Sequence, residues 1–291
     1  MHHRPLASVV ALLTLASTGF AASSPVELDT MTVTPESLKE EIPVGPYLQP
    51  EWTTRRRFPT TRIYLQQPPG GMGVEQWWRG KFYDNGDSKF RWQTEWEVGL
   101  PHRFQLDLYE NLEKDVEGTT RHDNFAFELR YALADWGKLP LNPTLYGEYK
   151  VTEDGPDVAE YKILLGDELT SSVHWGLNLV YEYELGGEER TQEWQASTAI
   201  SYAVNDRGWS IGAEAKAASE SVKGERDDPE QTLGIGPSLQ FRPTRNTHLD
   251  MVPLIGVNDD APDVEAYVVF GFDFGAPGKP AAFAPSSLKS N

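Results

Sequence analysis

Cysteine is absent from this chain of 291 residues, and only one long apolar run occurs, near its start. The missing thiols exclude disulfide bonds, thiol chemistry and zinc sites built on thiolates. Beyond residues 5–20, no apolar run approaches the roughly 20 residues of a spanning helix, which argues against a helical membrane protein. The formal net charge of -18 argues against nucleic acid as a partner, because phosphates would repel the chain.

Histidine, the usual general base of hydrolases, is scarce. After residue 3 the histidines are His102, His122, His174 and His248. No hydrolase signature surrounds them, although a serine triad requires a histidine as base. Glycine-rich stretches at 70–73 and 234–236 lack the strand-to-helix context of nucleotide loops, and the acidic stretches at 224–230 and 259–260 lack calcium-loop spacing. The sequence therefore predicts no catalytic residue, no cofactor and no metal site, and we do not expect an enzyme.

The N-terminal region divides into two parts. Arg4, an apolar run and the small residues Gly19 and Ala21 before a cleavage point predict a secretory signal peptide over residues 1–21. Residues 22–73 are rich in proline and show little alternation, so we expect an extended periplasmic segment there. The one dense basic run, residues 55–57, lies in this segment, and we interpret it as solvated.

From residue 74 to residue 274 the chain alternates between apolar and polar side chains. In the stretch that begins at Phe90, that residue, Trp92 and Trp96 share one side, and Arg91 and Glu95 share the other. About twelve such segments follow one another, separated by turn residues. Most approach the 9–11 residues that a tilted strand needs to cross a bilayer. Residues 275–291 remain as a C-terminal tail.

The faces opposite the apolar ones carry dense charge, as in a polar lumen, and aromatic residues lie near segment ends, as in interfacial girdles. We therefore predict an all-β fold, a transmembrane antiparallel up-and-down β-barrel of about 12 strands with its apolar faces toward lipid. The predicted lumen-lining residues are Arg79, Arg91, Glu95, Glu97, Arg103, Asp107, Glu128, Arg130, Glu148, Lys150, Glu182, Glu214 and Lys216. Predicted inward acids outnumber inward bases, so an open lumen is expected to prefer cations.

Connections between the segments alternate in charge. One set is acidic and the other is close to neutral, which is how an outer-membrane barrel separates extracellular loops from periplasmic turns. We expect the acidic loops to be solvated or to engage the cation-bridged lipopolysaccharide layer. The expected partners are thus outer-membrane lipid and lipopolysaccharide.

The segments "EQWWRGKFY" and "FRWQTEWEVGLPHRFQLDLYENL" resemble bacterial outer-membrane β-barrels of the porin or small-molecule transporter type, including those associated with aromatic-compound catabolism. The final segment, "VEAYVVFGFDF", resembles the closing signal read by the barrel-assembly machinery. These resemblances imply an outer-membrane location and passage of small solutes. Two alternatives stay open: a closed barrel with a structural or surface-interaction role, and an outer-membrane hydrolase.

A second resemblance follows the predicted cleavage point. Asp29, Thr30, Met31, Thr32 and Val33 are similar to the box by which energised outer-membrane receptors contact the TonB protein. The resemblance implies TonB as a partner. The alternative is an extended leader, since the chain is too short for the large barrel and globular plug of such receptors.

Overall fold

The computed structural model describes residues 38–116 and 118–275. The predicted signal peptide, the TonB-box-like residues 29–33 and residues 276–291 lie outside the described residues. Within the described residues, no helix has the length and apolar character needed to cross a membrane.

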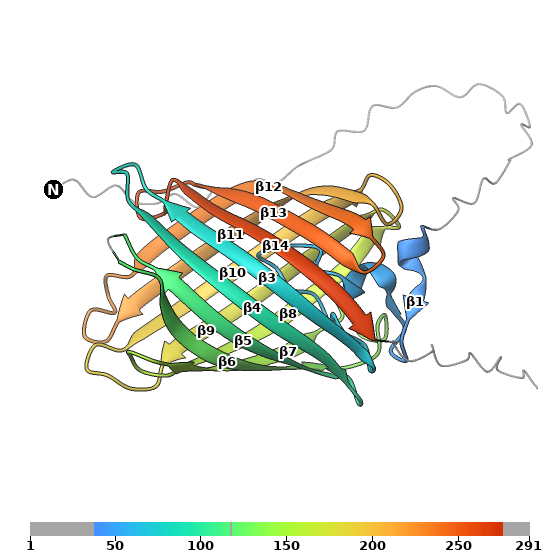
Figure 1. The fold of residues 1–291 in the computed structure, drawn as a ribbon, viewed down its shortest axis with the longest axis horizontal. Helices are drawn as coiled ribbons and strands as arrows, with labels where there is room; N and C mark the ends of the chain where they lie inside the picture. The colour runs from blue at the N-terminus through green and yellow to red at the C-terminus, as the bar shows by residue number, and fades with distance from the viewer. Residues whose placement is uncertain (1–37, 117, 276–291) are drawn as a thin grey trace, which may run out of the picture. The chain divides into compact units, whose positions relative to one another are not determined.

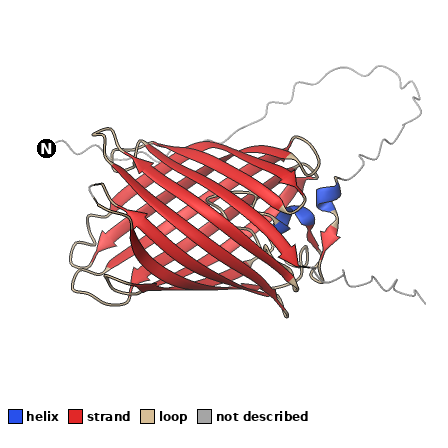
Figure 2. Ribbon diagram, viewed as in Figure 1, coloured by secondary structure: helices blue, strands red, loops and turns tan. Residues whose placement is uncertain are grey.

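Twelve antiparallel strands close into one barrel (Figures 1 and 2). They are β3 (Gly71–Phe82), β4 (Ser88–Leu100), β5 (Phe104–Lys114), β6 (Arg121–Ala132), β7 (Thr144–Thr152), β8 (Val158–Thr170), β9 (Val173–Glu184), β10 (Thr191–Ala203), β11 (Trp209–Val222), β12 (Glu230–Thr244), β13 (Thr247–Gly256) and β14 (Val264–Gly275). Each pairs with its neighbours in sequence, and β14 returns to β3 with Val268 opposite Trp78. The predicted fold class is confirmed.

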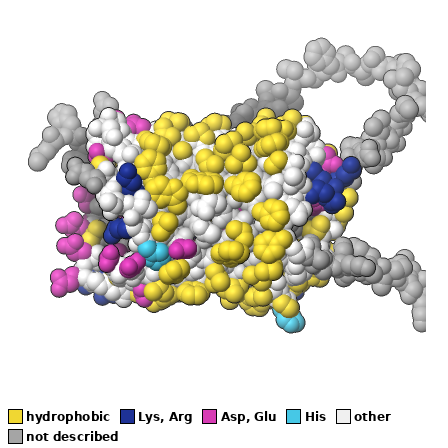
Figure 3. Space-filling view, viewed as in Figure 1, with side chains coloured by type: hydrophobic (Ala, Val, Ile, Leu, Met, Phe, Trp, Pro, Cys, Tyr) yellow, Lys and Arg dark blue, Asp and Glu magenta, His cyan; other side chains and the backbone are white. Residues whose placement is uncertain are grey.

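The outer wall of the barrel is apolar, because alternate residues of each strand point outward. On β6, Phe125, Phe127 and Leu129 are exposed by 50%, 52% and 46%, whereas Glu128 between them is 1% exposed. Figure 3 shows apolar side chains spread along the barrel wall. Such a surface is costly in water and suited to lipid.

The two ends of the barrel differ. We define the terminal rim as the end where β3 begins and β14 ends, with turns at 101–103, 133–143, 171–172, 204–208 and 245–246. The opposite end, the loop rim, carries connections that include 83–87, 153–157, 185–190, 223–229 and 257–263. Acidic side chains gather at the loop rim (Figure 3). The loop rim corresponds to the acidic connections that the sequence analysis expects to be extracellular, and the terminal rim to the near-neutral turns that it expects to be periplasmic.

Residues 38–70 close the terminal end of the barrel, and we term them the plug. They contain η1 (Lys39–Glu41), β1 (Pro43–Val44), β2 (Gln49–Pro50) and η2 (Glu51–Thr54), followed by irregular chain. The segment that carries β1 lies at one end of the barrel (Figure 1). Within the plug, Trp52, Phe58, Tyr64 and Leu65 are buried and form an apolar cluster that includes Trp136 of the terminal rim.

The plug requires a correction to the sequence analysis. Residues 22–73 were expected to form an extended periplasmic segment, but the described part from residue 38 packs against the barrel interior, and strand β3 already begins at Gly71. The physical reason is that four large apolar side chains in this segment lower their free energy by leaving water.

Candidate functional site

Five acidic side chains from neighbouring strands meet on the inner wall of the terminal half. The ladder sets Glu75 of β3 opposite Glu95 of β4, and Asp107 of β5 opposite both Glu97 of β4 and Glu128 of β6. Each of the five is at most 1% exposed. Like charges directly opposite one another repel, so this wall needs cations to be stable.

The plug supplies two of these cations. Arg56 Nη2 lies 2.7 Å from a carboxylate oxygen of Glu75, and Arg62 Nη2 lies 2.9 Å from one of Glu95. The third is Arg130 of β6, which lies 2.8 Å from Asp107 and also pairs with Glu128. The basic run at 55–57, interpreted from sequence as solvated, is thus partly buried as the counter-charge of the acidic wall.

The opposite wall holds the plug through neutral hydrogen bonds. The backbone N–H of Arg62 donates to Asn178 Oδ1 of β9 at 2.7 Å, and Asn178 Nδ2 donates back to the Arg62 carbonyl at 2.7 Å. Thr61 Oγ1 donates to Ser197 Oγ of β10 at 3.1 Å. The plug therefore bridges two walls of the barrel rather than resting on one.

Glycines of the barrel leave room for the plug. A Cβ atom at Gly99 would lie 2.0 Å from the carbonyl oxygen of Pro68, and one at Gly166 would lie 2.7 Å from Ile63 Cγ2. At Gly99 the obstructing atom is backbone and cannot rotate away. Barrel and plug are thus complementary in shape as well as in charge.

Above the plug, a cavity of about 290 Å³ extends to loop-rim residues 261–262, and we term it the vestibule. Its floor includes Pro59, Thr60 and Arg62 of the plug. Bases and acids line it in equal number: Arg62, Arg79, Lys81, Arg91, Lys150, Lys162 and Lys216 against Glu148, Glu160, Glu182, Glu193, Glu220, Glu230 and Glu265. The excess of inward acids expected from sequence lies instead in the buried wall, where arginines neutralise it.

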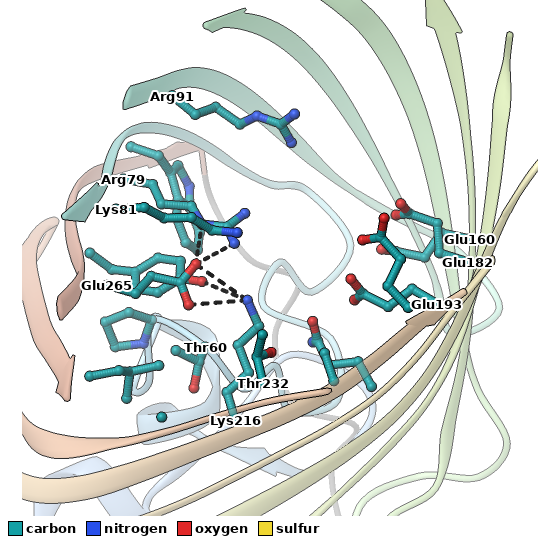
Figure 4. Close-up of a pocket in the computed structure, with 18 of the residues that line it drawn as sticks. Thr60, Arg79, Lys81, Arg91, Glu160, Glu182, Glu193, Lys216, Thr232 and Glu265 are labelled. Atoms are coloured by element: carbon teal, nitrogen blue, oxygen red, sulfur yellow. Dashed lines mark hydrogen bonds and ion pairs between the residues drawn. The ribbon is translucent and has the colours of Figure 1, made fainter. Parts of the chain in front are cut away.

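Both sides of the vestibule carry acids and bases. Arg79, Lys81 and Arg91, from β3 and β4, lie on one side, and acids from β8, β9 and β10 face them (Figure 4). These acids are Glu160, Glu182 and Glu193. On the basic side, Lys216 Nζ lies 3.3 Å from Glu265, which also pairs with Arg79. On the facing side, Lys150 pairs with Glu182 and Lys162 Nζ lies 2.6 Å from a carboxylate oxygen of Glu160, so these acids also have counter-charges.

The structure divides the predicted lumen residues into two groups. Arg79, Arg91, Glu148, Lys150, Glu182 and Lys216 line the vestibule. Glu95, Glu97, Asp107, Glu128, Arg130 and Glu214 are buried in the terminal half. There the backbone N–H of Thr60 donates to Glu214 at 2.8 Å, which makes Glu214 another plug contact.

Arg103 is a correction. It lies in the turn at 101–103, before β5 begins at Phe104, and its Nε donates to the carbonyl of Ala132 at 3.1 Å on the terminal rim. Its backbone φ of 65° is not that of a β-strand, so the inward–outward alternation of β5 does not apply to Arg103. The prediction that Arg103 lines the lumen is therefore wrong.

Several carboxylates lie close enough together to suggest a cation site. The groups Glu75, Glu95 and Glu97, and Glu95, Asp107 and Glu128, have ligand atoms within 4.8 Å of one another. Arg56, Arg62 and Arg130 already place guanidinium groups there. These clusters serve as binding sites for the plug.

Comparisons with known proteins agree with this architecture. Residues 165–274, from within β8 to the end of β14, match a family described as "Putative MetA-pathway of phenol degradation". An outer-membrane channel from Pseudomonas putida F1 is similar in structure, with a TM-score of 0.54 at 13% identity over 72% of this chain and 98% of that chain. This chain shares the closed β-barrel fold of that channel. The NanC porin also matches, with a TM-score of 0.48 at 13% identity over 70% of this chain and 98% of that one.

No curated protein matched the sequence. The predicted resemblance to outer-membrane barrels, including those associated with aromatic-compound catabolism, is confirmed by the family match and by the shared fold. The predicted outer-membrane location agrees with the same findings and with the apolar outer wall.

Proposed function

We propose that this outer-membrane β-barrel is a porin-like channel for small solutes, closed at its periplasmic end by the plug. The observation that carries the proposal is the floor of the vestibule. A cavity lined by charged side chains extends from the loop rim and ends on Pro59, Thr60 and Arg62, which belong to the plug and not to the barrel wall. Movement of the plug would join the vestibule to the periplasm.

All contacts that hold the described plug are reversible. They are ion pairs such as Arg62 with Glu95, hydrogen bonds such as Thr61 with Ser197, and apolar packing. A buried ion pair adds little net stability relative to its solvated partners, although breaking one side alone is costly. The plug can therefore bind at one defined position in the barrel and still dissociate from it.

The vestibule suits small aromatic compounds that carry charge or hydroxyl groups. Trp77, Tyr109, Tyr146 and Tyr267 line it together with the basic side chains described above. Aromatic faces stack with aromatic solutes, and guanidinium and ammonium groups attract phenolate or carboxylate oxygens. The match to a family named for phenol degradation supports the same class of solute.

The hydrolase alternative receives less support from the site. His122 pairs with Glu153, His174 with Glu41, and His248 with Asp250. Among the described residues, the hydrogen bonds of these rings go to carboxylates and not to a serine hydroxyl. These contacts favour the channel over the hydrolase alternative.

A reversible crosslink tests the channel. The chain has no cysteine, so the double variant Thr61→Cys/Ser197→Cys introduces the only thiols, at positions whose hydroxyls lie 3.1 Å apart. In planar bilayers we expect few or no conductance steps when the pair is oxidised and clear steps after reduction. The single variant Thr61→Cys, treated with the same oxidant, is the control and should behave like the parent protein.

Two outcomes would contradict the proposal. Silence of the parent and of the reduced variant at all voltages would favour the closed structural barrel. Equal conductance of the oxidised and reduced double variant would show that the plug does not close the lumen.

A further inference from the structure

Basic side chains gather where β3, β4 and β5 meet the loop rim. They line a small cavity of about 170 Å³, which we term the rim pocket. Its lining contains five bases and only two acids, although the whole chain carries a formal net charge of -18. The bases are Arg79, Lys81, Lys89, Arg91 and Lys114. Positive charge is thus concentrated at one place in an acidic chain.

The strand register places like charges against one another in this region. Arg79 of β3 is opposite Arg91 of β4. Lys81 is opposite Lys89, two residues nearer the loop rim. Bases directly opposite one another on one face of a sheet repel. The acidic wall of the terminal half has the same arrangement with the opposite sign, and there the plug supplies the counter-charge.

Carboxylates neutralise the two arginines. Arg91 Nη2 lies 2.9 Å from a carboxylate oxygen of Asp123. Arg79 pairs with Glu265, which also lies 3.3 Å from Lys216 Nζ. Dashed lines in Figure 4 mark both contacts of Glu265. One carboxylate therefore serves two bases on this side of the vestibule.

The two opposed lysines lack such a partner. Among the residues that the structure describes, neither Lys81 nor Lys89 forms an ion pair with a carboxylate. The two acids of the rim pocket, Glu113 and Asp115, both pair with Arg121 of β6. Two ammonium groups thus line the rim pocket without a counter-charge from the protein.

Aromatic side chains lie next to the basic ones. The Arg79 guanidinium lies 5.4 Å from the centre of the Tyr267 ring. Tyr267 and Trp77 line the vestibule, which shares Arg79, Lys81 and Arg91 with the rim pocket. Aromatic rings stack on one another, and ammonium groups form strong charge-assisted hydrogen bonds to carboxylates. The region therefore offers partners for both parts of an aromatic acid.

We propose that the rim pocket binds the carboxylate of small aromatic acids at the loop rim and makes the channel selective for anionic solutes. This rests on the proposed function in one respect, namely that solutes enter the vestibule from the loop rim. It reverses the cation preference expected from the count of inward charges. The acidic loops repel such a solute only over about 8–10 Å at physiological salt, whereas Lys81 and Lys89 contact it directly.

Calorimetric titration of the detergent-purified protein with benzoate tests the rim pocket. We expect the parent protein to bind benzoate, and Lys81→Gln/Lys89→Gln to weaken this binding by roughly tenfold or more, because hydrogen bonds to charged groups are the stronger ones. Benzyl alcohol, which has the ring without the charge, should bind to neither protein. The double variant should fold like the parent, since it removes two charges that repel one another.

A matched control is Lys223→Gln, which removes the same charge from the loop rim at a position outside the rim pocket. This variant should bind benzoate like the parent protein. A loss as large as that of the double variant would show that only net charge matters, and would overturn the rim pocket. Inorganic phosphate that binds as tightly as benzoate would overturn the assignment to aromatic acids in favour of a general anion site.

Reversal potentials in planar bilayers separate this proposal from the channel itself. In a gradient of sodium benzoate we expect the parent protein to prefer the anion and Lys81→Gln/Lys89→Gln to lose most of that preference. Conductance that prefers sodium, by a protein that binds no benzoate, would overturn the rim pocket and leave the channel intact. Benzoate binding that depends on Lys81 and Lys89, in a protein that never conducts ions, would support the rim pocket as a binding site and overturn the channel.

Discussion

The two halves of the lumen use the same residue types in opposite ways. In the terminal half, Glu95, Asp107 and Arg130 are fully buried, and plug arginines complete their pairing. In the vestibule half, Arg91 retains 37% exposure of its side chain while it pairs with Asp123. Charge that holds a segment in place must be desolvated, whereas charge that guides a solute must remain in water.

The largest expected effect comes from removing one buried cation. Arg130→Ala leaves Asp107 and Glu128 without their common partner, so we expect a loss of about 3–5 kcal/mol in the free energy of unfolding. Arg91→Ala in the vestibule half should cost at most about 1 kcal/mol, because water screens that pair. Urea unfolding of the refolded barrels, followed by tryptophan fluorescence, measures both.

Equal losses for Arg130→Ala and Arg91→Ala would show that the two halves do not differ in desolvation. Arg130→Lys is the control for folding, since it keeps the positive charge while losing the forked geometry of the guanidinium. We expect its loss to fall between those of the two alanine variants.

A charge on the lipid face should have the next largest effect. Leu179 of β9 points outward and is 46% exposed, so Leu179→Arg should cost about 2–4 kcal/mol near the bilayer centre. Gln195 of the adjacent strand lines the vestibule, and Gln195→Arg should be close to neutral. The same urea unfolding measurement tests both variants. Similar losses in the free energy of unfolding at both positions would contradict the assignment of inward and outward faces.

The inward–outward alternation alone would have suggested Asn178→Arg as the control for Leu179→Arg. Asn178, next to Leu179, points inward, so an arginine there would be expected to be mild. The structure shows two hydrogen bonds of 2.7 Å between Asn178 and the backbone of Arg62, which the larger side chain would break. An inward position is tolerant only where the plug is absent.

The fold could be predicted because its signal is local. Each strand repeats every two residues, and the decision between lipid and lumen follows from which face carries charge, as Phe127 and Glu128 illustrate. The plug has no such period. Arg56 and Glu75 come together through the tertiary structure and not through a local pattern, so the basic run looked solvated in the sequence.

The pairing of two prolines was hidden in the sequence for a related reason. Pro237 and Pro253 are ordinary turn or edge residues when each is considered alone. Their meaning depends on the register of β12 against β13, which sets them opposite one another. The prediction for Arg103 was wrong for a different reason. The alternation of β5 was extended to a residue that precedes the first residue of the strand, Phe104.

The smallest expected effect concerns the pH dependence of the plug at the terminal rim. Burial raises the pKa of Glu41 in η1 from 4.5 to about 9, the neighbouring Glu168 and Glu40 carboxylates act in the same direction, and Arg57 opposes them. A neutral Glu41 can donate to Nε2 of His174, 2.7 Å away.

Because the docked plug holds the proton more tightly than the free plug, docking is strongest below about pH 4.5 and weakens as the pH rises toward about 9. The open fraction in planar bilayers should therefore increase across this range in the parent protein. Glu41→Gln keeps a hydrogen-bond donor for His174 and cannot ionise, so its open fraction should stay low and change little. An unaltered rise with pH in Glu41→Gln would show that Glu41 does not control docking of the plug. A flat profile in the parent would show that Glu41 exerts no control over the plug, and the two halves of the lumen would then be independent of pH as well as distinct in solvation.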